Sequence, residues 1–167
     1  MARLATLEFY PVAFNFSSAH FTLFSATSRE RLHGHNYSVA ASLTAKIHEP
    51  GLTFDYAIFK KKLTRLCEEL DSYLILPGQS PYLKITERSD HYEVHFDSDQ
   101  MFFLKKDTLI LPIANTTLED FSQWFIDRLT SDADFLKQND IHALTIKVFN
   151  SPNQSGSAHF GAENTRE

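Results

Sequence analysis

Residues 12–20 read Val-Ala-Phe-Asn-Phe-Ser-Ser-Ala-His, and residues 33–43 read His-Gly-His-Asn-Tyr-Ser-Val-Ala-Ala-Ser-Leu. In both stretches the large or functional side chains recur at every second position, which is the spacing of residues on one face of a β-strand. The connection between them, residues 21–31, is too long for a tight turn, and loops of this kind often carry function. The two stretches therefore predict neighbouring strands joined by a functional loop.

Two amphipathic helices are expected further along the chain. Asp55 is a candidate N-cap, and apolar residues then recur at helical spacing from Phe59 to Leu70. Thr116 and Glu119 have the spacing of a capping box ahead of a second helix. Short strands are expected over residues 83–111 and about 141–149.

This order of elements predicts an α+β fold. We expect an antiparallel four-stranded sheet with two helices on one face and an extra hairpin between the helices. The 167 residues are expected to form one domain with its core over about 8–160. The segment from Ser151 onward, rich in Ser, Gly and Asn, predicts a tail that is loose at its end.

Composition argues against several classes of function. The net charge of -5 disfavours a general nucleic-acid binder held by backbone electrostatics. A single cysteine, Cys67, rules out a disulfide framework and fits a reducing compartment. No apolar run approaches the ~20 residues of a membrane span, and the N-terminus lacks the apolar core of a signal peptide. We therefore expect a cytoplasmic protein with neither a nucleic-acid nor a membrane partner.

Three histidines lie at the adjoining ends of the first two predicted strands. His33 and His35 are two residues apart, so on a strand both imidazoles point the same way. His20 ends the preceding strand, and antiparallel pairing can bring it alongside them. Three neutral imidazoles with a vacant fourth position are what a catalytic zinc site requires. The spacing alone also fits ordinary polar residues at the edge of a strand.

Several short motifs follow one another along the chain. In order, they are Phe14-x-Phe16-x-x-Ala19-His20, Leu32-His33-Gly34-His35-Asn36-Tyr37, Gly51-Leu52-x-Phe54-Asp55-Tyr56, Leu70-Asp71, Asn115-Thr116-Thr117-x-Glu119 and Ile146-x-Val148-x-x-Ser151-Pro152. In this order they resemble the 6-pyruvoyl-tetrahydropterin synthase and 6-carboxytetrahydropterin synthase family. The resemblance implies the tunnelling fold and assembly into trimers or hexamers with active sites at subunit interfaces. It also implies a Zn²⁺ ion on His20, His33 and His35.

The resemblance implies a reaction on 7,8-dihydroneopterin triphosphate. Most enzymes of the family place a catalytic cysteine shortly before His-Gly-His, where this chain has Arg29. Glu30 instead completes Glu-x-x-His-Gly-His, a pattern similar to the branch that makes 6-hydroxymethyl-dihydropterin for folate synthesis. Glu30 is therefore one catalytic candidate. Asp71 is the other, although the histidine that follows it in the family is Ser72 here.

The family's pterin pocket carries over to Thr116, Thr117, Glu119 and Asn150. Asn150 stands where the family has an anchoring glutamate, and an amide offers one acceptor where a carboxylate offers a fork of two. Arg31 is a candidate for binding the triphosphate. Arg29 and the run 60–62 are further candidates, and that run is otherwise the solvated face of a helix.

Three hypotheses are compatible with these observations. The first is a zinc-dependent lyase of the 6-pyruvoyl- or 6-carboxytetrahydropterin synthase type. Within it, Glu30 favours the 6-hydroxymethyl product, and the 6-carboxy product of the 7-deazaguanine (queuosine) route is the nearest alternative. The second is a catalytically silent paralogue that keeps zinc but binds a different small molecule or partner. The third is a purely structural zinc domain, which three histidines without a fourth ligand disfavour.

Overall fold

The computed structural model describes residues 3–161. Its longest strand, β3 (His33–Lys46), is central to the large sheet. It pairs antiparallel with β1 (Leu4–Phe9), β2 (Asn15–His20) and β9 (Ile141–Ser151). A further strand, β10 (Gln154–Phe160), pairs antiparallel with β9. The expected four-stranded antiparallel sheet is therefore present as β10-β9-β3-β2, and the α+β class is confirmed.

Three strands of this sheet, β1, β4 (Tyr73–Pro77) and β10, are not among the expected ones. β1 lies beside β3, and β4 runs parallel to β2. β8 (Thr108–Leu111) runs parallel to β4 and completes the seven strands. β4 reads Tyr-Leu-Ile-Leu-Pro, so its apolar residues form a continuous run rather than the alternation by which strands are found in a sequence.

The first predicted strand begins later than expected, at Asn15. Pro11 opens a short 3-10 turn, Pro11–Ala13, because its fixed φ and missing N–H suit the first position of a helical turn. Val12 therefore points to solvent, with 91% of its surface exposed. The later positions of the same alternation are buried as predicted, namely Phe14, Phe16, Ser18 and His20.

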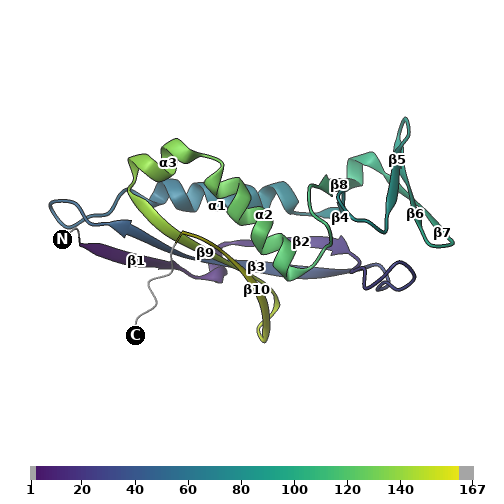
Figure 1. The fold of residues 1–167 in the computed structure, drawn as a ribbon, viewed down its shortest axis with the longest axis horizontal. Helices are drawn as coiled ribbons and strands as arrows, with labels where there is room; N and C mark the ends of the chain where they lie inside the picture. The colour runs from purple at the N-terminus through teal and green to yellow at the C-terminus, as the bar shows by residue number, and fades with distance from the viewer. Residues whose placement is uncertain (1–2, 162–167) are drawn as a thin grey trace.

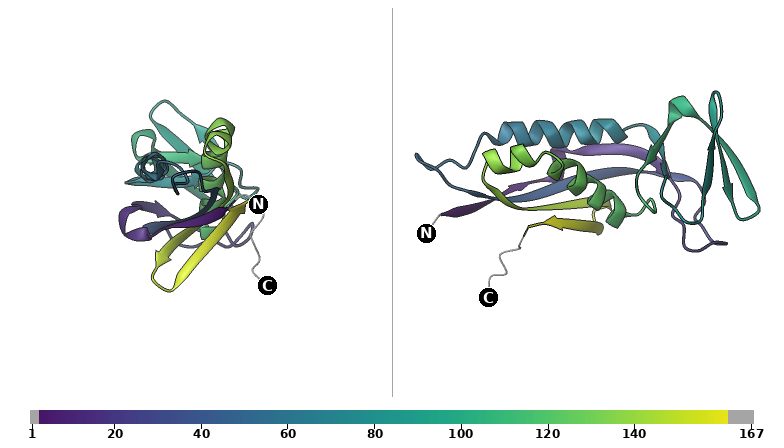
Figure 2. Two further views of the ribbon diagram at one scale, coloured as in Figure 1. Left: turned by 90° about the vertical axis from the view of Figure 1, so that its left-hand side faces the viewer. Right: turned by 45° about the horizontal axis from the view of Figure 1, so that its top comes forward.

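Three helices cover one face of the large sheet, as Figure 1 and Figure 2 show. α1 (Tyr56–Leu70) and α2 (Leu118–Thr130) are the two expected helices, and the short α3 (Ala133–Gln138) follows. Asp55 caps α1 as predicted, because its side chain accepts a hydrogen bond from the Ala57 amide at 3.0 Å. The expected capping box of α2 is wrong by one residue. Thr117, not Thr116, caps the helix by accepting from the Asp120 amide.

Aromatic side chains fill the space between the helices and the sheet. The ring of Phe16 on β2 stacks on Tyr37 of β3, with ring centroids 4.9 Å apart. Phe121 of α2 meets both rings edge-on. The His20 ring lies 5.8 Å from the Tyr37 ring, centroid to centroid. The aromatic core therefore packs directly against the predicted functional residues.

Much of the segment after Ser151 is ordered, because β10 packs against the beginning of α2. A Cβ atom on Gly156 would lie 2.5 Å from the carbonyl carbon of Leu118, so only glycine permits this approach. The predicted looseness of the chain end concerns residues 162–167, which lie outside the described residues.

The expected hairpin between the helices is a separate three-stranded antiparallel sheet at one end of the molecule (Figure 1). It consists of β5 (Lys84–Glu87), β6 (His91–Phe96) and β7 (Asp99–Leu104), and we call it the accessory sheet. A second apolar cluster joins Phe96 of this sheet to Phe21 and Leu23. The accessory sheet therefore packs on the loop between β2 and β3.

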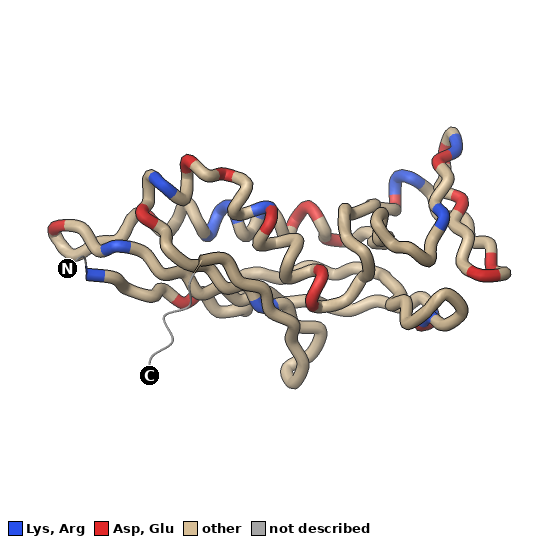
Figure 3. Tube along the Cα trace, in the orientation of Figure 1, with Lys and Arg blue, Asp and Glu red and all other residues tan. Residues whose placement is uncertain are grey.

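Charged residues gather on the helices and the accessory sheet, whereas the large sheet carries few of them (Figure 3). β2 and β10 contain no Lys, Arg, Asp or Glu. Among residues 3–161, no helix combines the length and the apolar character that a membrane crossing demands.

Candidate metal centre and adjoining cavity

The three predicted ligand histidines converge because of the strand register. His20, the last residue of β2, pairs directly with His33, the first residue of β3. His35 lies two residues further on the same face of β3. One ring nitrogen from each histidine lies within 4.8 Å of the others. The pairing of β2 with β3 therefore brings the three imidazoles together without a contribution from a loop.

Backbone carbonyls fix the orientation of two of these rings. The Nδ1 atom of His20 lies 2.9 Å from the Thr116 carbonyl oxygen, and the Nδ1 atom of His33 lies 2.7 Å from that of Arg31. A carbonyl can only accept, so we assign the proton of each ring to Nδ1. The Nε2 lone pairs of both rings are then free to bind a metal ion.

The Nε2 atoms point at a common space. Those of His33 and His35 are 3.0 Å apart, close to the roughly 3.3 Å between ligands of a tetrahedral ion with metal–nitrogen bonds of about 2.0 Å. The Nε2 atom of His20 is buried and has no hydrogen-bond partner among the described residues. A metal ion would satisfy this atom, so the donor set fits a site with three imidazoles and an open position.

Burial favours the neutral form of the His20 and His35 rings. Burial, followed by the neighbouring His33, lowers the pKa of His20 from 6.5 to about 4. The pKa of His35 is lowered for the same two reasons. Neutral imidazole is the form that coordinates metal ions, so both residues are ready to bind at neutral pH.

Glu30 lies beside the cluster at the end of the loop between β2 and β3. Its Oε2 atom accepts a hydrogen bond from the Thr22 amide at 3.0 Å and is 3.9 Å from the Nε2 atom of His33. Partial burial opposes ionisation, but the hydrogen bonds from Thr22 and the proximity of His33 outweigh it and lower the pKa of Glu30. The side chain is therefore a carboxylate at neutral pH and can accept a proton.

A cavity of about 280 Å³ adjoins the cluster. Its walls include most of the residues that the sequence analysis selected, and these are His20, His35, Glu30, Thr116, Thr117, Glu119 and Asn150. The Oδ1 atom of Asn150 is buried and lacks a hydrogen-bond partner among the described residues. Free acceptors and a carboxylate in one cavity form a surface that can bind a polar ring compound.

Three predicted site residues, namely His33, Asp71 and Arg31, do not line this cavity. Asp71 lies at the end of α1, where its Oδ1 atom accepts from the Ser17 amide at 2.7 Å and its Oδ2 atom accepts from the Ser72 hydroxyl. The Ser17 contact is made by a backbone amide of β2, and Asp71 is not among the residues that line the cavity. The Arg31 side chain is exposed, and the carbonyl of Arg31 is what contacts His33.

Sequence reasoning missed several residues of the site. Tyr37 lines the cavity, and its alternation with His33 and His35 was the available signal. Thr22, Gln154 and Ser155 also line it. Loop residue Thr22 and β10 carry no periodic pattern that could have placed them there.

Asn115 and Thr116 connect the beginning of α2 to the loop after β2. The Asn115 side chain accepts from the Leu23 amide at 3.0 Å and donates to the Leu23 carbonyl at 2.8 Å. The hydroxyl of Thr116, which is fully buried, donates to the Phe21 carbonyl at 2.8 Å. Thr116 is therefore engaged with the loop and with His20, which explains why Thr117 caps the helix instead.

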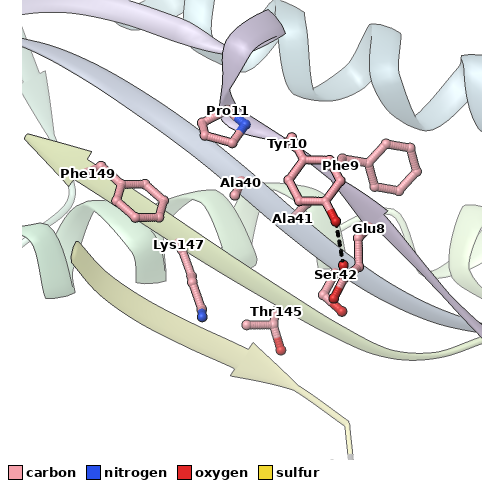
Figure 4. Close-up of a pocket in the computed structure, with 10 residues that line it drawn as sticks. All are labelled: Glu8, Phe9, Tyr10, Pro11, Ala40, Ala41, Ser42, Thr145, Lys147 and Phe149. Atoms are coloured by element: carbon pink, nitrogen blue, oxygen red, sulfur yellow. Dashed lines mark hydrogen bonds between the residues drawn. The ribbon is translucent and has the colours of Figure 1, made fainter. Parts of the chain in front are cut away.

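A second cavity of about 230 Å³ lies on the other face of the large sheet, between β1, β3 and β9 (Figure 4). Its wall is mainly apolar, with Pro11, Ala40 and Phe149, and the Tyr10 hydroxyl donates to Glu8 at 2.9 Å. It lacks the converging imidazoles of the first cavity, so the candidate chemistry lies on the helix-covered face.

Known proteins resemble this chain in sequence over most of its length. The sequence profile of 6-pyruvoyl tetrahydropterin synthase matches residues 11–159. A Methanocaldococcus jannaschii protein, provisionally named 6-carboxy-5,6,7,8-tetrahydropterin synthase, is 27% identical over 134 residues, which are 80% of this chain and 82% of that protein.

Solved structures give the same result. The 6-pyruvoyl tetrahydropterin synthase of Plasmodium vivax has a TM-score of 0.89 and 32% identity, with 96% of this chain and 99% of that chain covered. The Plasmodium falciparum enzyme has a TM-score of 0.88 and 30% identity, with 95% and 99% covered. Two further P. vivax structures carry alanine or cysteine in place of a glutamate described as a catalytic residue. These likenesses confirm the tunnelling fold, and the chain belongs to the 6-pyruvoyl tetrahydropterin synthase family.

Proposed function

We propose that this protein is a zinc-dependent lyase that acts on 7,8-dihydroneopterin triphosphate. The observation that carries the proposal is the meeting of three imidazoles and one carboxylate, Glu30, beside a single cavity. Family membership supports a tetrahydropterin synthase-like function. The metal, the substrate and the product are the proposed part.

His20, His33 and His35 would hold the zinc ion, which would polarise a side-chain hydroxyl of the substrate when bound. Glu30 would accept the proton of that hydroxyl, because its carboxylate is ionised and is oriented by the Thr22 amide. The neighbouring carbon–carbon bond would then break as in a retro-aldol reaction. The deprotonated oxygen would become the carbonyl oxygen of a released aldehyde that carries the triphosphate, and the bond electrons would stay on the carbon next to the pterin ring. Return of the proton from Glu30 to the carbon left behind would give the 6-hydroxymethyl product.

The cavity would hold the pterin ring through Thr116, Thr117, Glu119 and Asn150, all of which line it. The exposed Arg31 side chain would meet the triphosphate outside. A glutamate is described as a catalytic residue of the P. vivax enzyme, which supports a catalytic role for Glu30. The 6-carboxy product is the nearest alternative, and the M. jannaschii relative carries that name.

A second candidate function is a silent paralogue that binds zinc and a different small molecule or partner. It is favoured by Asn150, whose buried Oδ1 atom stands unpartnered in the cavity where a carboxylate would accept twice. Asp71 also favours it, since the side chain bonds to Ser17 and Ser72 instead of lining the cavity. Asp71 would act in turnover only if assembly brought it to a cavity of another subunit.

Self-association into a trimer or hexamer is part of the proposal. β10 forms an edge of the large sheet and carries no charged residue. An edge strand exposes unpaired N–H and C=O groups that can pair with another chain, and charges are the usual obstacle to such pairing. Edge pairing between copies would extend the sheet across subunits.

The test is incubation of purified, zinc-loaded protein with 7,8-dihydroneopterin triphosphate, followed by chromatography and mass spectrometry of the pterin products. We expect 6-hydroxymethyl-dihydropterin from the wild type and none from His35→Ala. His142→Ala is the matched control, because His142 lies exposed on β9 and does not line the cavity. No product from the wild type, or equal turnover in His35→Ala, would refute the proposal.

A further inference from the structure

The side chain of Arg29 joins the accessory sheet to the loop that carries Glu30. Its guanidinium carbon lies 5.3 Å from the ring centroid of Phe21 and 5.7 Å from that of Phe96 on β6. The Nη1 atom donates a hydrogen bond to the Glu30 carbonyl at 3.0 Å. The Nη2 atom forms an ion pair with Asp99 on β7 at 2.8 Å. These contacts engage the guanidinium with protein groups, which disfavours the triphosphate-binding role considered for Arg29.

The loop also folds back on itself around Glu30. Leu23 and Arg29 form an isolated antiparallel bridge. The Glu30 amide donates to the Thr22 carbonyl at 2.8 Å, and the Thr22 amide donates to the Glu30 carboxylate at 3.0 Å. The carboxylate is therefore oriented by the backbone of its own loop. A displacement of Arg29 would therefore disturb the two hydrogen bonds between Thr22 and Glu30.

We infer that Arg29 and Asp99 form a positioning pair through which the accessory sheet holds the Glu30 carboxylate beside the histidine cluster. The inference rests on the proposed function, since it assigns the pair a role in placing the proposed base. Its physical basis is that charge-assisted bonds and guanidinium–aromatic contacts in a partly buried setting are stronger than exposed neutral ones. The Arg29 side chain is 20% exposed.

Variants of Arg29 and Asp99 test the positioning pair, and a variant of a second ion pair nearby serves as the control. Asp99→Asn removes the charge of a side chain that is 54% exposed, so the fold should tolerate it. Arg29→Met removes the whole guanidinium, and Arg29→Lys is the conservative variant. Lys105→Met is the matched control, because it breaks a 2.6 Å ion pair between Lys105, which directly follows β7, and Glu87 of the accessory sheet.

Two measurements on the full-length protein are needed. Amide hydrogen exchange over residues 21–32 reports on the loop whether or not turnover occurs. We expect exchange at Thr22 and Glu30 to rise about tenfold in Arg29→Met and Asp99→Asn. We expect kcat to fall by about 10- to 100-fold with KM little changed, because misplacement of a catalytic group reduces the rate of the chemical step. Arg29→Lys should recover part of the loss, and Lys105→Met should match the wild type.

Unchanged exchange in both Arg29→Met and Asp99→Asn would overturn the inference. A rise in KM with unchanged kcat would also overturn it, because Arg29 would then be a substrate contact. Zinc-loaded wild-type protein without turnover would refute the proposed function instead. In that case the exchange rates alone decide whether the pair holds the loop.

Discussion

His20 at the end of β2 lies directly across from His33 at the beginning of β3, and their ring centroids are 4.7 Å apart. The relationship is set by the hydrogen-bond register of two neighbouring strands. His35 joins the pair because a strand returns to the same face after two residues. The candidate metal centre is therefore built when the sheet forms, and the loop between the strands needs only to supply Glu30.

Loss of stability on mild acidification is expected for the metal-free protein. Burial and the adjacent His33 lower the pKa of His20 to about 4, whereas an unfolded chain takes up this proton near pH 6.5. The unfolded state therefore binds more protons between these values, and stability decreases as the pH falls through this window. By pH 5 the titration of His20 lowers the free energy of unfolding by about 2 kcal/mol.

Urea unfolding at pH 7 and pH 5, in the presence of a chelator, measures this effect. His20→Asn keeps a donor toward the Thr116 carbonyl but cannot titrate, so the variant should show the smaller pH dependence of unfolding free energy. Carboxylates with low pKa values change the unfolding free energy mainly below pH 4.5, and they change it equally in the wild type and in the variant. An equal loss of stability in the wild type and the variant would contradict the burial argument.

Glu30→Gln should abolish most of the turnover while leaving metal binding intact. The amide keeps the size of the side chain but cannot accept a proton, and general-base catalysis contributes about 10²- to 10⁴-fold. Steady-state kinetics together with metal analysis of the same sample separate the two effects. Glu69→Gln is the control, because Glu69 forms only a surface ion pair with Arg128. Full activity in Glu30→Gln would exclude Glu30 as the base.

Asn150→Glu should strengthen binding of a dihydropterin about tenfold. The substitution replaces the single acceptor of an amide with the two acceptors of a carboxylate, at a position whose Oδ1 atom is buried in the cavity wall. Calorimetric titration with 7,8-dihydroneopterin measures the change, and Asn153→Glu at an exposed position is the control. Binding by neither the wild type nor Asn150→Glu would favour the silent paralogue.

Gly156→Ala should destabilise the protein by about 1–3 kcal/mol. The added methyl group would collide with the backbone at the beginning of α2, 2.5 Å from the Leu118 carbonyl carbon. Thermal unfolding of this variant and of Ser157→Ala, whose side chain is exposed, gives the comparison. Equal stability of the two variants would show that β10 does not dock on α2 as described.

The sequence carried the information for the parts of the fold that have a regular pattern. Alternation from Phe14 to His20 predicted the buried face of β2, and the spacing of His33 and His35 predicted the histidine cluster. The Asp55 cap was predictable because its bond is local. These features depend on residues that are close together in the chain.

Features that depend on distant partners were not predictable. β4 is a continuous apolar run, and β10 is a strand only because it pairs with β9. Thr116 satisfies the spacing of a helix cap, but Phe21 and His20 engage it instead. The placement of Asp71 away from the cavity and the contact of Arg29 with Asp99 likewise arise from tertiary packing.

X-ray absorption at the zinc edge of the purified protein probes the proposed metal centre most directly. We predict one zinc ion per chain with three nitrogen neighbours at about 2.0–2.1 Å, one oxygen neighbour and no sulfur. Cys67, the only cysteine of the chain, lies on the buried face of α1 and cannot contribute. A sulfur neighbour near 2.3 Å, or a protein that binds no stoichiometric zinc when supplied with it, would contradict the proposed three-imidazole centre.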